Sequence, residues 1–310
     1  MQNSIFTKLP EGFGGDFGKK PLGCEHNLHE REMFSDAGLV RLLETYPRDE
    51  FNIYTMNDDP RTGKRVFRRG HAGDASGEEI LDAIKSGRLW LNLRATNDHL
   101  DEYDELCSEM FGSLEDEVPG LKTLRRDCGV LISSPKARVF YHLDIPLVTL
   151  WQIRGEKTFY VFPNGSPFVD DHELESVVLR EEEEEITYDE RFEASAKRYE
   201  LKPGVMVSWP QNAPHRIDNG DSLNVSLSCE FQTMESVVRA NALYTNGVMR
   251  RKLGMSPDIA KIGSAGLYTR ASIARVMKAF NSRKVFEKEV PVTFVVDPSS
   301  ETGFREQAAV

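Results

Sequence analysis

The tripeptide His-Leu-Asp occurs twice in this chain, as His99 to Asp101 and as His142 to Asp144. Imidazole and carboxylate groups both bind transition metals, so a histidine two residues before an aspartate could supply two ligands to one ion. The local structure decides whether it can, because residues two apart point in different directions on a helix but share one face of a strand.

The two copies lie in segments of different character. The first lies in TNDHLDEYDELCSEMFGSL, where apolar residues recur at helical spacing behind an Asn or Asp cap, so a helix is predicted there. The second follows the strand-forming sequence VFY and precedes another β-branched and aromatic run. We therefore predict that His142 and Asp144 can bind one metal ion and that His99 and Asp101 cannot.

A third ligand is expected from His215, which follows Pro214 at the start of a predicted strand. Two histidines and one carboxylate on one side of an ion form a facial triad, which leaves coordination positions open and suits non-haem Fe(II) oxygen chemistry. A plainer alternative stays open, because a lone His-x-Asp on a strand is more often a hydrogen-bonded surface pair.

With these motifs the chain resembles the JmjC-type, cupin-like Fe(II)- and 2-oxoglutarate-dependent oxygenases over roughly residues 139 to 231. The family pattern is His-x-Asp, then Gly-x-Lys before an aromatic strand and Phe-Pro, then Pro-Gly and a distal histidine. The matching positions outside the triad are Gly155, Lys157, Phe162, Pro163, Pro203, Gly204 and Pro210. The resemblance implies that His142, Asp144 and His215 bind Fe(II). It also implies that Lys157 pairs with the distal carboxylate of the cosubstrate 2-oxoglutarate.

The chain also departs from the family pattern. Val205 stands where the family usually has Asp, and Ala213 and Pro214 stand where many members have two Trp residues. Val148 occupies a position where some relatives place a polar residue near the cosubstrate. The polar contacts of 2-oxoglutarate other than Lys157 are therefore left open among Tyr141, Thr149, Trp151, Ser226 and Ser228.

The sequence around Lys157 supports its assignment independently. A two-residue turn at Gly155-Glu156 would make Arg154 and Lys157 cross-strand partners in a hairpin. Counting back along the strand by twos then reaches the two predicted metal ligands, so all of these side chains are expected on one face unless Pro146 shifts the register. The alternative is a lysine that caps a hairpin in solvent.

The resemblance implies a mainly β fold with α additions, built on a double-stranded β-helix, the cupin-like jelly roll. We expect an N-terminal arm and short helix at residues 1–50, the jelly-roll domain at 51–231, and a C-terminal helical segment and tail at 232–310. The helix in the arm is predicted to begin behind the N-cap Ser35 and to end before Pro47.

The implied activity is that of a 2-oxoglutarate-dependent dioxygenase, which uses O2 to hydroxylate a C–H bond. The substrate is left open between a protein side chain and a small metabolite. Two alternatives remain: a cupin enzyme that does not use 2-oxoglutarate, and a catalytically silent cupin-like protein that binds or regulates. His-x-Asp rather than His-x-His, together with Lys157, favours the oxygenase.

The composition excludes several classes of protein. The net charge of −11 over 310 residues argues against attraction of the whole surface to nucleic acid or anionic lipid. No run approaches the ~18 uncharged apolar residues of a membrane span, and the first residues lack the pattern of a signal peptide, so a cytoplasmic protein is expected. The four cysteines form no Cys-x-x-Cys pair and are expected to be buried thiols.

Two further polar patterns do not predict a second site. Cys24, His26 and His29 form Cys-x-His-x-x-His, but no fourth ligand for a zinc site lies nearby. In residues 223–231 polar and apolar residues alternate, which predicts a strand with one polar face. We expect that face to be solvated rather than to line a cavity.

Charge is distributed unevenly along the chain. Residues 170–193 contain 12 acidic residues against two arginines, and residues 236–288 contain 11 basic residues against two acidic ones. The acidic segment is expected to be a solvated loop, with a lid or a reader of a basic substrate as the alternative. The basic segment is expected to form surface helices. Their alternative roles are pairing two subunits into a homodimer or docking onto the acidic segment.

Overall fold

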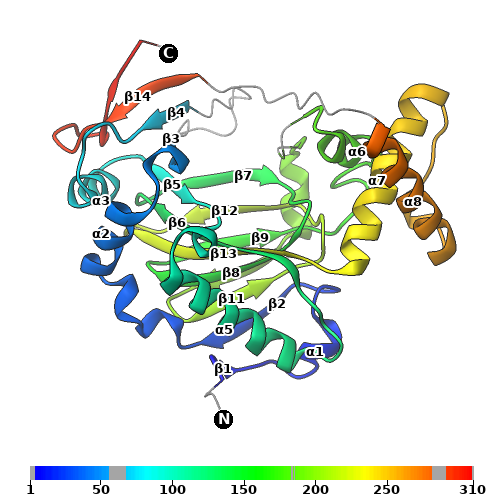
Figure 1. Cartoon of the computed structure of the whole chain (residues 1–310), viewed down its shortest axis with the longest axis horizontal. Coiled ribbons are helices and arrows are strands. Elements are labelled where there is room, and N and C mark those ends of the chain that lie inside the picture. Colours follow the sequence, from blue (N-terminus) through cyan, green and yellow to red (C-terminus); the bar gives the residue numbers. More distant parts are fainter. Residues whose placement is uncertain (1–3, 56–67, 183, 185, 281–290, 309–310) are drawn as a thin grey trace.

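The computed structural model describes residues 4–55, 68–182, 184, 186–280 and 291–308, and it is mainly β structure with helices around it (Figure 1). Its strands form one large and one small sheet. The order in the large sheet is β1 (Phe6–Lys8), β2 (Leu22–His26), β11 (Val205–Ser208), β8 (Leu147–Arg154), β13 (Asn224–Gln232), β6 (Leu124–Ser133), β5 (Trp90–Leu93), β3 (Asn52–Thr55), β4 (Arg68–His71), β14 (Val292–Val296) and β15 (Phe304–Glu306). The order in the small sheet is β10 (Lys197–Leu201), β9 (Lys157–Val161), β12 (His215–Asn219) and β7 (Arg138–His142).

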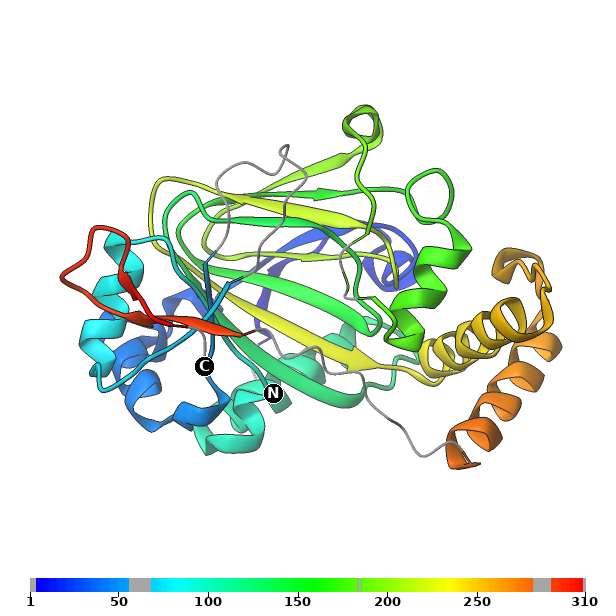
Figure 2. The ribbon, with the colours of Figure 1, turned by 90° about the horizontal axis from the view of Figure 1, so that it is seen from above.

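The two sheets face each other across an apolar core, as the view from above shows (Figure 2). Val148 and Leu150 of β8 contribute from the large sheet, and Phe159 of β9 and Ile217 of β12 contribute from the small one. Because side chains alternate along a strand, every second residue of these strands points into the space between the sheets. We call this space the interior.

Helices cover the outer face of the large sheet. They are α2 (Asp36–Thr45), α3 (Gly77–Ser86) and α5 (Asp101–Glu117), and Trp151 and Ile153 of β8 belong to the same apolar cluster as their buried side chains. β8 is thus buried on both faces, which explains why apolar residues occur on both of its faces. α2 begins behind Ser35 as predicted, because the Ser35 hydroxyl accepts a hydrogen bond from the backbone N–H of Gly38.

The first His-Leu-Asp is helical, as predicted, but the helix is interrupted there. α4 (Thr96–His99) ends at His99 and α5 begins at Asp101, with Leu100 extended between them. The His99 ring packs against that of Tyr46, with the ring centroids 5.1 Å apart. Within the described residues this copy belongs to no group of three clustered metal-binding side chains.

Both ends of the described chain belong to the large sheet. β1 and β2, with α1 (Phe13–Asp16) between them, extend the sheet beside β11. At the far edge β14 pairs in parallel with β4, and β15 pairs with β14. The ring of Phe294, which is fully buried, lies over Gly70, where any side chain would clash with it. Short 3-10 turns are η1 (Leu28–Glu30), η2 (Glu32–Phe34), η3 (Arg48–Glu50) and η6 (Ile259–Lys261).

The predicted hairpin at Gly155-Glu156 is wrong. β8 and β9 belong to different sheets, so this turn carries the chain from one sheet to the other. Both edges of β8 are already occupied, by β11 and β13, and β9 pairs with β10 and β12 instead. Gly155 adopts φ +71°, a left-handed conformation that glycine tolerates. Arg154 therefore does not lie opposite Lys157; its guanidinium lies 2.6 Å from the carboxylate of Asp36.

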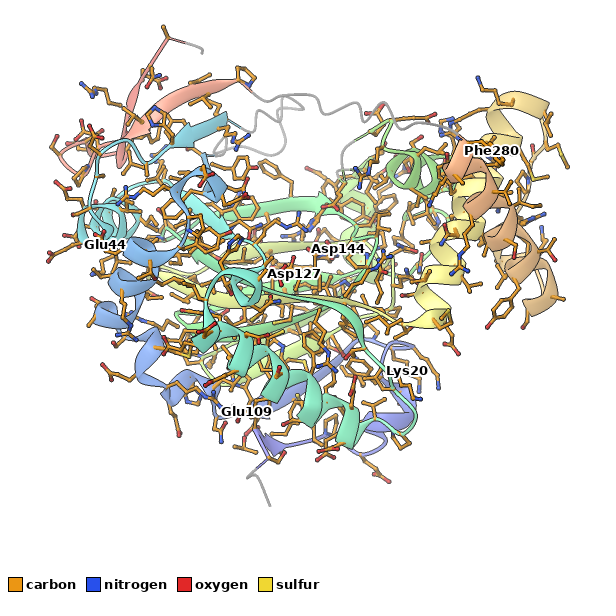
Figure 3. All side chains as sticks on the ribbon, in the orientation of Figure 1. Lys20, Glu44, Glu109, Asp127, Asp144 and Phe280 are labelled. Atoms are coloured by element: carbon orange, nitrogen blue, oxygen red, sulfur yellow. The ribbon has the colours of Figure 1, made fainter. Side chains whose placement is uncertain are left out.

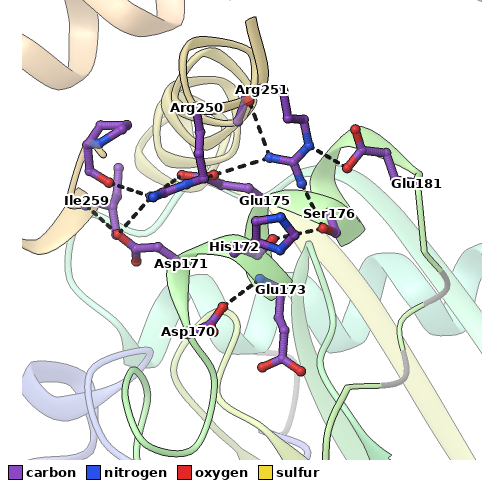
Figure 4. A network of polar contacts seen from close by, with 12 residues as sticks. Asp170, Asp171, His172, Glu173, Glu175, Ser176, Glu181, Arg250, Arg251 and Ile259 are labelled. Carbon is purple, nitrogen blue, oxygen red and sulfur yellow. Dashed lines mark hydrogen bonds and ion pairs between the residues drawn. The ribbon is translucent and has the colours of Figure 1, made fainter. Parts of the chain in front are cut away.

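The first part of the acidic segment is docked onto the first of the basic C-terminal helices. The acidic segment forms α6 (Asp171–Leu179) and η5 (Glu190–Ser195), and the basic segment forms α7 (Met234–Leu253) and α8 (Ser264–Phe280). Arg250 lies 2.7 Å from the carboxylate of Glu175, and Arg251 lies 2.6 Å from that of Glu181 (Figure 4). The prediction of a solvated loop is wrong for α6, because its carboxylates pair with α7. Among the helices described, none is long and apolar enough to cross a membrane.

Glu175 is expected to stabilise this docking strongly. It is fully buried, and both Arg250 and Arg251 contact its carboxylate, at 2.7 and 3.4 Å. Replacing Glu175 with alanine should lower the free energy of unfolding by about 3 kcal/mol, because two partly buried guanidinium groups would lose their one fully buried partner and keep only Asp171 and Glu181. Urea denaturation measures the change, and Glu182→Ala is the matched control on an exposed residue of the same segment. A loss below about 1 kcal/mol would contradict the expectation.

Candidate metal centre

His142 and Asp144 lie at one end of the small sheet. His142 is the last residue of β7, and Asp144 lies two residues later in the link to β8 rather than in the strand itself. Nδ1 of His142 lies 2.7 Å from the carbonyl oxygen of Phe140, so this nitrogen donates its proton and leaves Nε2 for a metal. Nε2 lies 4.0 Å from a carboxylate oxygen of Asp144. Figure 3 shows Asp144 near the strand ends closest to α6 and α7.

His215 brings the third side chain from the neighbouring strand. It is the first residue of β12 and pairs directly with His142 in the ladder. Its Nδ1 lies 3.1 Å from the carbonyl oxygen of Ala213, and its Nε2 lies 3.3 Å from the Asp144 carboxylate. The three side chains each offer one atom, and these atoms lie within 4.8 Å of one another. The structure thus brings together the three residues that the sequence singled out.

The charges of this cluster suit a divalent cation. Burial lowers the pKa of His215, as does His142 beside it, and burial raises the pKa of Asp144. Within the described residues only the two histidines lie within ion-pair distance of Asp144. Arg94 lowers the pKa of Asp144 from a longer distance, but no lysine or arginine contacts this buried carboxylate directly. Two imidazoles and one carboxylate are a donor set that Fe(II) accepts. The residues present therefore fit the predicted metal.

Lys157 lies on the interior face of β9, in the same sheet as the two histidines. It alternates with Phe159 and Val161, and Val161 pairs with His215 in the ladder. Four residues along a strand span about 13 Å, a gap that a lysine side chain and a five-carbon diacid can bridge end to end. Lys157 thus shares a face with His215 and with His142, which pairs with His215. The sequence predicted a shared face with His142 and Asp144, but through the hairpin that does not form.

Lys157 is buried, and the described part of the chain gives it no counter-charge. Its residue is only 5% exposed, and burial lowers its pKa to about 7. No described carboxylate pairs with it or shifts its pKa. Because an unpaired ammonium group is unfavourable in an apolar environment, this position favours the binding of an anion.

The polar face of β13 lines the interior, and the expectation of a solvated face is wrong. Ser226 and Ser228 pair across the sheet with Gln152 and Leu150 of β8, and Leu150 belongs to the interior core. The Ser226 hydroxyl donates to Oε1 of Gln152, whose Nε2 donates to Asn224. The outer face of β13 lies under the helices and therefore carries the apolar residues of the alternating pattern.

The five side chains considered as further contacts of 2-oxoglutarate lie on different sides of the sheets. Trp151 lies in the outer cluster, and its Nε1 donates to the Thr149 hydroxyl at 2.9 Å. Tyr141 packs in the cluster beside α6 and donates to the carbonyl oxygen of Phe168. Of the five candidates, Ser226 and Ser228 remain on the interior face.

Arg94 and Glu230 are charged neighbours of the centre that the sequence did not single out. A guanidinium nitrogen of Arg94 lies 3.2 Å from the Glu230 carboxylate. Burial raises the pKa of Glu230 to about 7, and Asp144 and Asp127 add to this effect while Arg94 opposes it. Glu230 lies on the polar face of β13, with Ser226 and Ser228. If that face had been assigned to the interior from the sequence, alternation along the strand would have placed Glu230 on the side of the metal ligands.

The remaining cysteine and histidine patterns have packing roles. All four cysteines are free and buried, as expected. His26 is 1% exposed and its ring lies against Trp151, with the centroids 5.1 Å apart. Cys24, His26 and His29 do not form a clustered group of three ligands in the described part of the chain.

Comparison with known proteins gives similarity at the level of solved structures only. No protein-family model matches the chain. No curated protein sequence matches it. A structure of ycfD from E. coli is similar with 17% identity and a TM-score of 0.49, covering 91% of this chain and 71% of that one. A structure described as YcfD, a ribosomal oxygenase from Escherichia coli, with cobalt and 2-oxoglutarate has 16% identity and a TM-score of 0.48, covering 90% and 69%. Another, with cobalt and succinic acid, has 16% identity and a TM-score of 0.45, covering 90% and 69%.

Similarity this low does not transfer the chemistry of those proteins to this chain.

Proposed function

We propose that the protein is a 2-oxoglutarate-dependent dioxygenase that hydroxylates a C–H bond of a protein side chain or a small metabolite. The observation that carries the proposal is the presence of two features on one interior surface. One is a triad of two histidines and an aspartate that fits a divalent metal. The other is Lys157, a buried lysine that has no counter-charge among the residues the structure describes. A triad alone would fit many metalloproteins and a buried lysine alone would fit many anion sites, but together they match a metal and a dicarboxylate cosubstrate.

Each residue has a defined role in this proposal. His142, Asp144 and His215 bind Fe(II), and the ammonium group of Lys157 holds the distal carboxylate of 2-oxoglutarate. Bound Fe(II) supplies the activation of O2, which couples the conversion of 2-oxoglutarate to succinate and CO2 with the conversion of a substrate C–H bond to C–OH. The apolar interior around Phe159 and Leu150 excludes water between the lysine and the metal.

The fold proposal follows the same reasoning. We propose that the two facing sheets form a double-stranded β-helix, that the jelly-roll domain spans residues 51–231, and that residues 1–50 and 232–310 are additions to it. The interior position of the site between the sheets supports this arrangement. A cytoplasmic location and a homodimer formed through the C-terminal helices stay predictions.

The two alternative functions account for less of the site. A cupin enzyme that does not use 2-oxoglutarate would leave Lys157 buried without a counter-charge. A silent binding or regulatory protein would leave the triad without a role. Succinate formation from 2-oxoglutarate separates the proposed enzyme from both alternatives: the enzyme should form succinate slowly even without its substrate, in a reaction that needs both Fe(II) and O2. Absence of succinate from protein shown to bind both Fe(II) and 2-oxoglutarate would favour the silent protein.

The pKa of Lys157 predicts how cosubstrate binding depends on pH. Burial lowers this pKa from 10.5 to about 7, so the free site loses its positive charge as the pH rises through about 7. In metal-saturated protein the Kd for 2-oxoglutarate should therefore be constant below that pH and rise by up to about tenfold per pH unit above it. The stability of the protein without cosubstrate changes with pH in the opposite sense: stability rises over the pH range in which cosubstrate binding weakens. The unfolded chain binds the proton more tightly, so this lysine makes the protein more stable as the pH rises from about 7 to 10.5.

Titration calorimetry with Mn(II)-saturated protein between about pH 6 and 9 measures this dependence. Lys157→Arg is the matched control, because a guanidinium group stays protonated throughout and should give a Kd that does not change with pH. An equally steep rise in the arginine variant would assign the effect to another group.

A further inference from the structure

We propose that Gln211 and Asn212 form a two-amide clamp that positions the metal ligand Asp144, and that α7 braces this clamp. The inference rests on the proposed metal-binding function and adds positioning residues to it. The two residues immediately precede the Ala213-Pro214-His215 sequence, so one loop would serve both the aspartate and the distal histidine.

Asp144 needs support from outside the link in which it lies. β7 ends at His142 and β8 begins at Leu147, so the ligand lies in a link whose backbone is outside both strands. Its side chain must nevertheless stay near two imidazoles that are each fixed by a backbone carbonyl at Nδ1. A free link would allow the carboxylate to move away from them.

Two consecutive amide side chains hold this link. Nδ2 of Asn212 donates to the carbonyl oxygen of Asp144 at 2.8 Å, and Nε2 of Gln211 donates to that of Ile145, also at 2.8 Å. The hydrogen bonds fix two successive peptide groups, one of them that of the ligand itself. The orientation of the Asp144 backbone, and with it the direction of its side chain, is thereby set by the loop that carries His215.

α7 holds the clamp from the other side. Nε of Arg239 donates to Oδ1 of Asn212 at 3.3 Å, which fixes the amide with its NH2 group directed at Asp144. Nε2 of Gln211 also lies 3.3 Å from the carbonyl oxygen of Ser236, in the first turn of α7. The C-terminal helical segment is in this way connected to the metal centre by two hydrogen bonds.

The backbone at Asn212 is specialised for this position. Asn212 is 2% exposed and adopts φ +64°, a left-handed conformation that asparagine tolerates better than most residues. The turn places the Asn212 side chain on the Asp144 link and, one residue later, the Ala213 carbonyl oxygen on Nδ1 of His215. Glycine would keep this backbone conformation while removing the amide.

The test is cobalt binding by wild type, Asn212→Gly and Gln211→Ala. We expect the affinity for Co(II) to fall by roughly 10- to 100-fold in each variant, the range typical when groups that orient metal ligands are removed. The visible absorption of the bound Co(II) should also change, because the carboxylate would no longer be held in one geometry. Thermal unfolding of the metal-free variants shows whether they fold, and Gln211→Ala, at a partly exposed position, keeps the test valid if Asn212→Gly is unstable.

Asn164→Ala is the matched control. Nδ2 of Asn164 donates to the backbone carbonyl of Gln211 at 2.8 Å, so this amide supports the same loop without touching the Asp144 link. Equal weakening of Co(II) binding in Asn164→Ala, or unchanged affinity and spectrum in both clamp variants, would overturn the clamp. Failure of the wild-type protein to bind Co(II) would instead overturn the proposed function, so the two failures are distinguishable.

Discussion

Replacing Asp144 with alanine is expected to abolish tight metal binding, and His142→Ala and His215→Ala should do the same. The expected loss in affinity exceeds about 100-fold for each, because removing groups that only orient ligands already costs 10- to 100-fold. Asp144 is the sole carboxylate of the triad, and the two imidazoles that remain would carry no negative charge to attract a dication.

The first His-Leu-Asp supplies the control for this series. His99→Ala removes a histidine of the same local sequence whose ring packs against Tyr46, so it should lower stability slightly and leave metal affinity unchanged. The Fe(II) affinity of all four variants is measured by equilibrium dialysis under anaerobic conditions. Metal affinity retained in Asp144→Ala, or lost in His99→Ala, would show that the metal centre is placed wrongly.

Replacing Lys157 should separate cosubstrate binding from metal binding. Lys157→Ala is expected to leave Fe(II) affinity nearly unchanged and to weaken 2-oxoglutarate by about 2 to 5 kcal/mol, the cost of removing one partner of a partly buried charged hydrogen bond. At ~1.4 kcal/mol per tenfold change, this is roughly 30-fold or more in Kd. Lys157→Arg should recover only part of the loss, because the planar guanidinium group needs more room than an ammonium group.

A stability measurement distinguishes this role from an ordinary structural one. Lys157 is buried without a partner in the described residues, so Lys157→Met should leave the metal-free protein as stable as wild type or more stable. The same variant should lose 2-oxoglutarate binding. Wild-type affinity for 2-oxoglutarate in Lys157→Ala would mean that another cation holds the acid. A large loss of stability in Lys157→Met would mean that the lysine supports the fold.

The sequence predicted those parts of the centre that depend on local periodicity or on a motif. The choice of His142 over His99 needed only the difference between strand and helix character. His142 ends a strand and His99 ends a helix, but Asp144 lies beyond that strand and Leu100 is extended between two helices. The triad and Lys157 followed from motif spacing, which is a property of the chain itself. These features do not require knowledge of which strands are neighbours.

The wrong and missing parts depend on long-range pairing. The hairpin prediction failed because both edges of β8 are occupied by strands that lie far along the chain, β11 and β13. The polar face of β13 was assigned to the wrong side because helices cover the outer face of the large sheet. Gln211 and Asn212 gave no signal, since their partners are backbone carbonyls 66 and 68 residues away in sequence.

Anaerobic visible spectroscopy tests the central claim most directly. A complex in which 2-oxoglutarate chelates Fe(II) at the triad gives a charge-transfer band in the visible range, so no substrate needs to be known. We predict that this band forms when Fe(II) and 2-oxoglutarate are added to the wild-type protein and that it is absent in Asp144→Ala. At limiting 2-oxoglutarate it should be weaker in Lys157→Ala than in wild type. A wild-type protein that binds Fe(II) but shows no such band at saturating 2-oxoglutarate would contradict the proposed function.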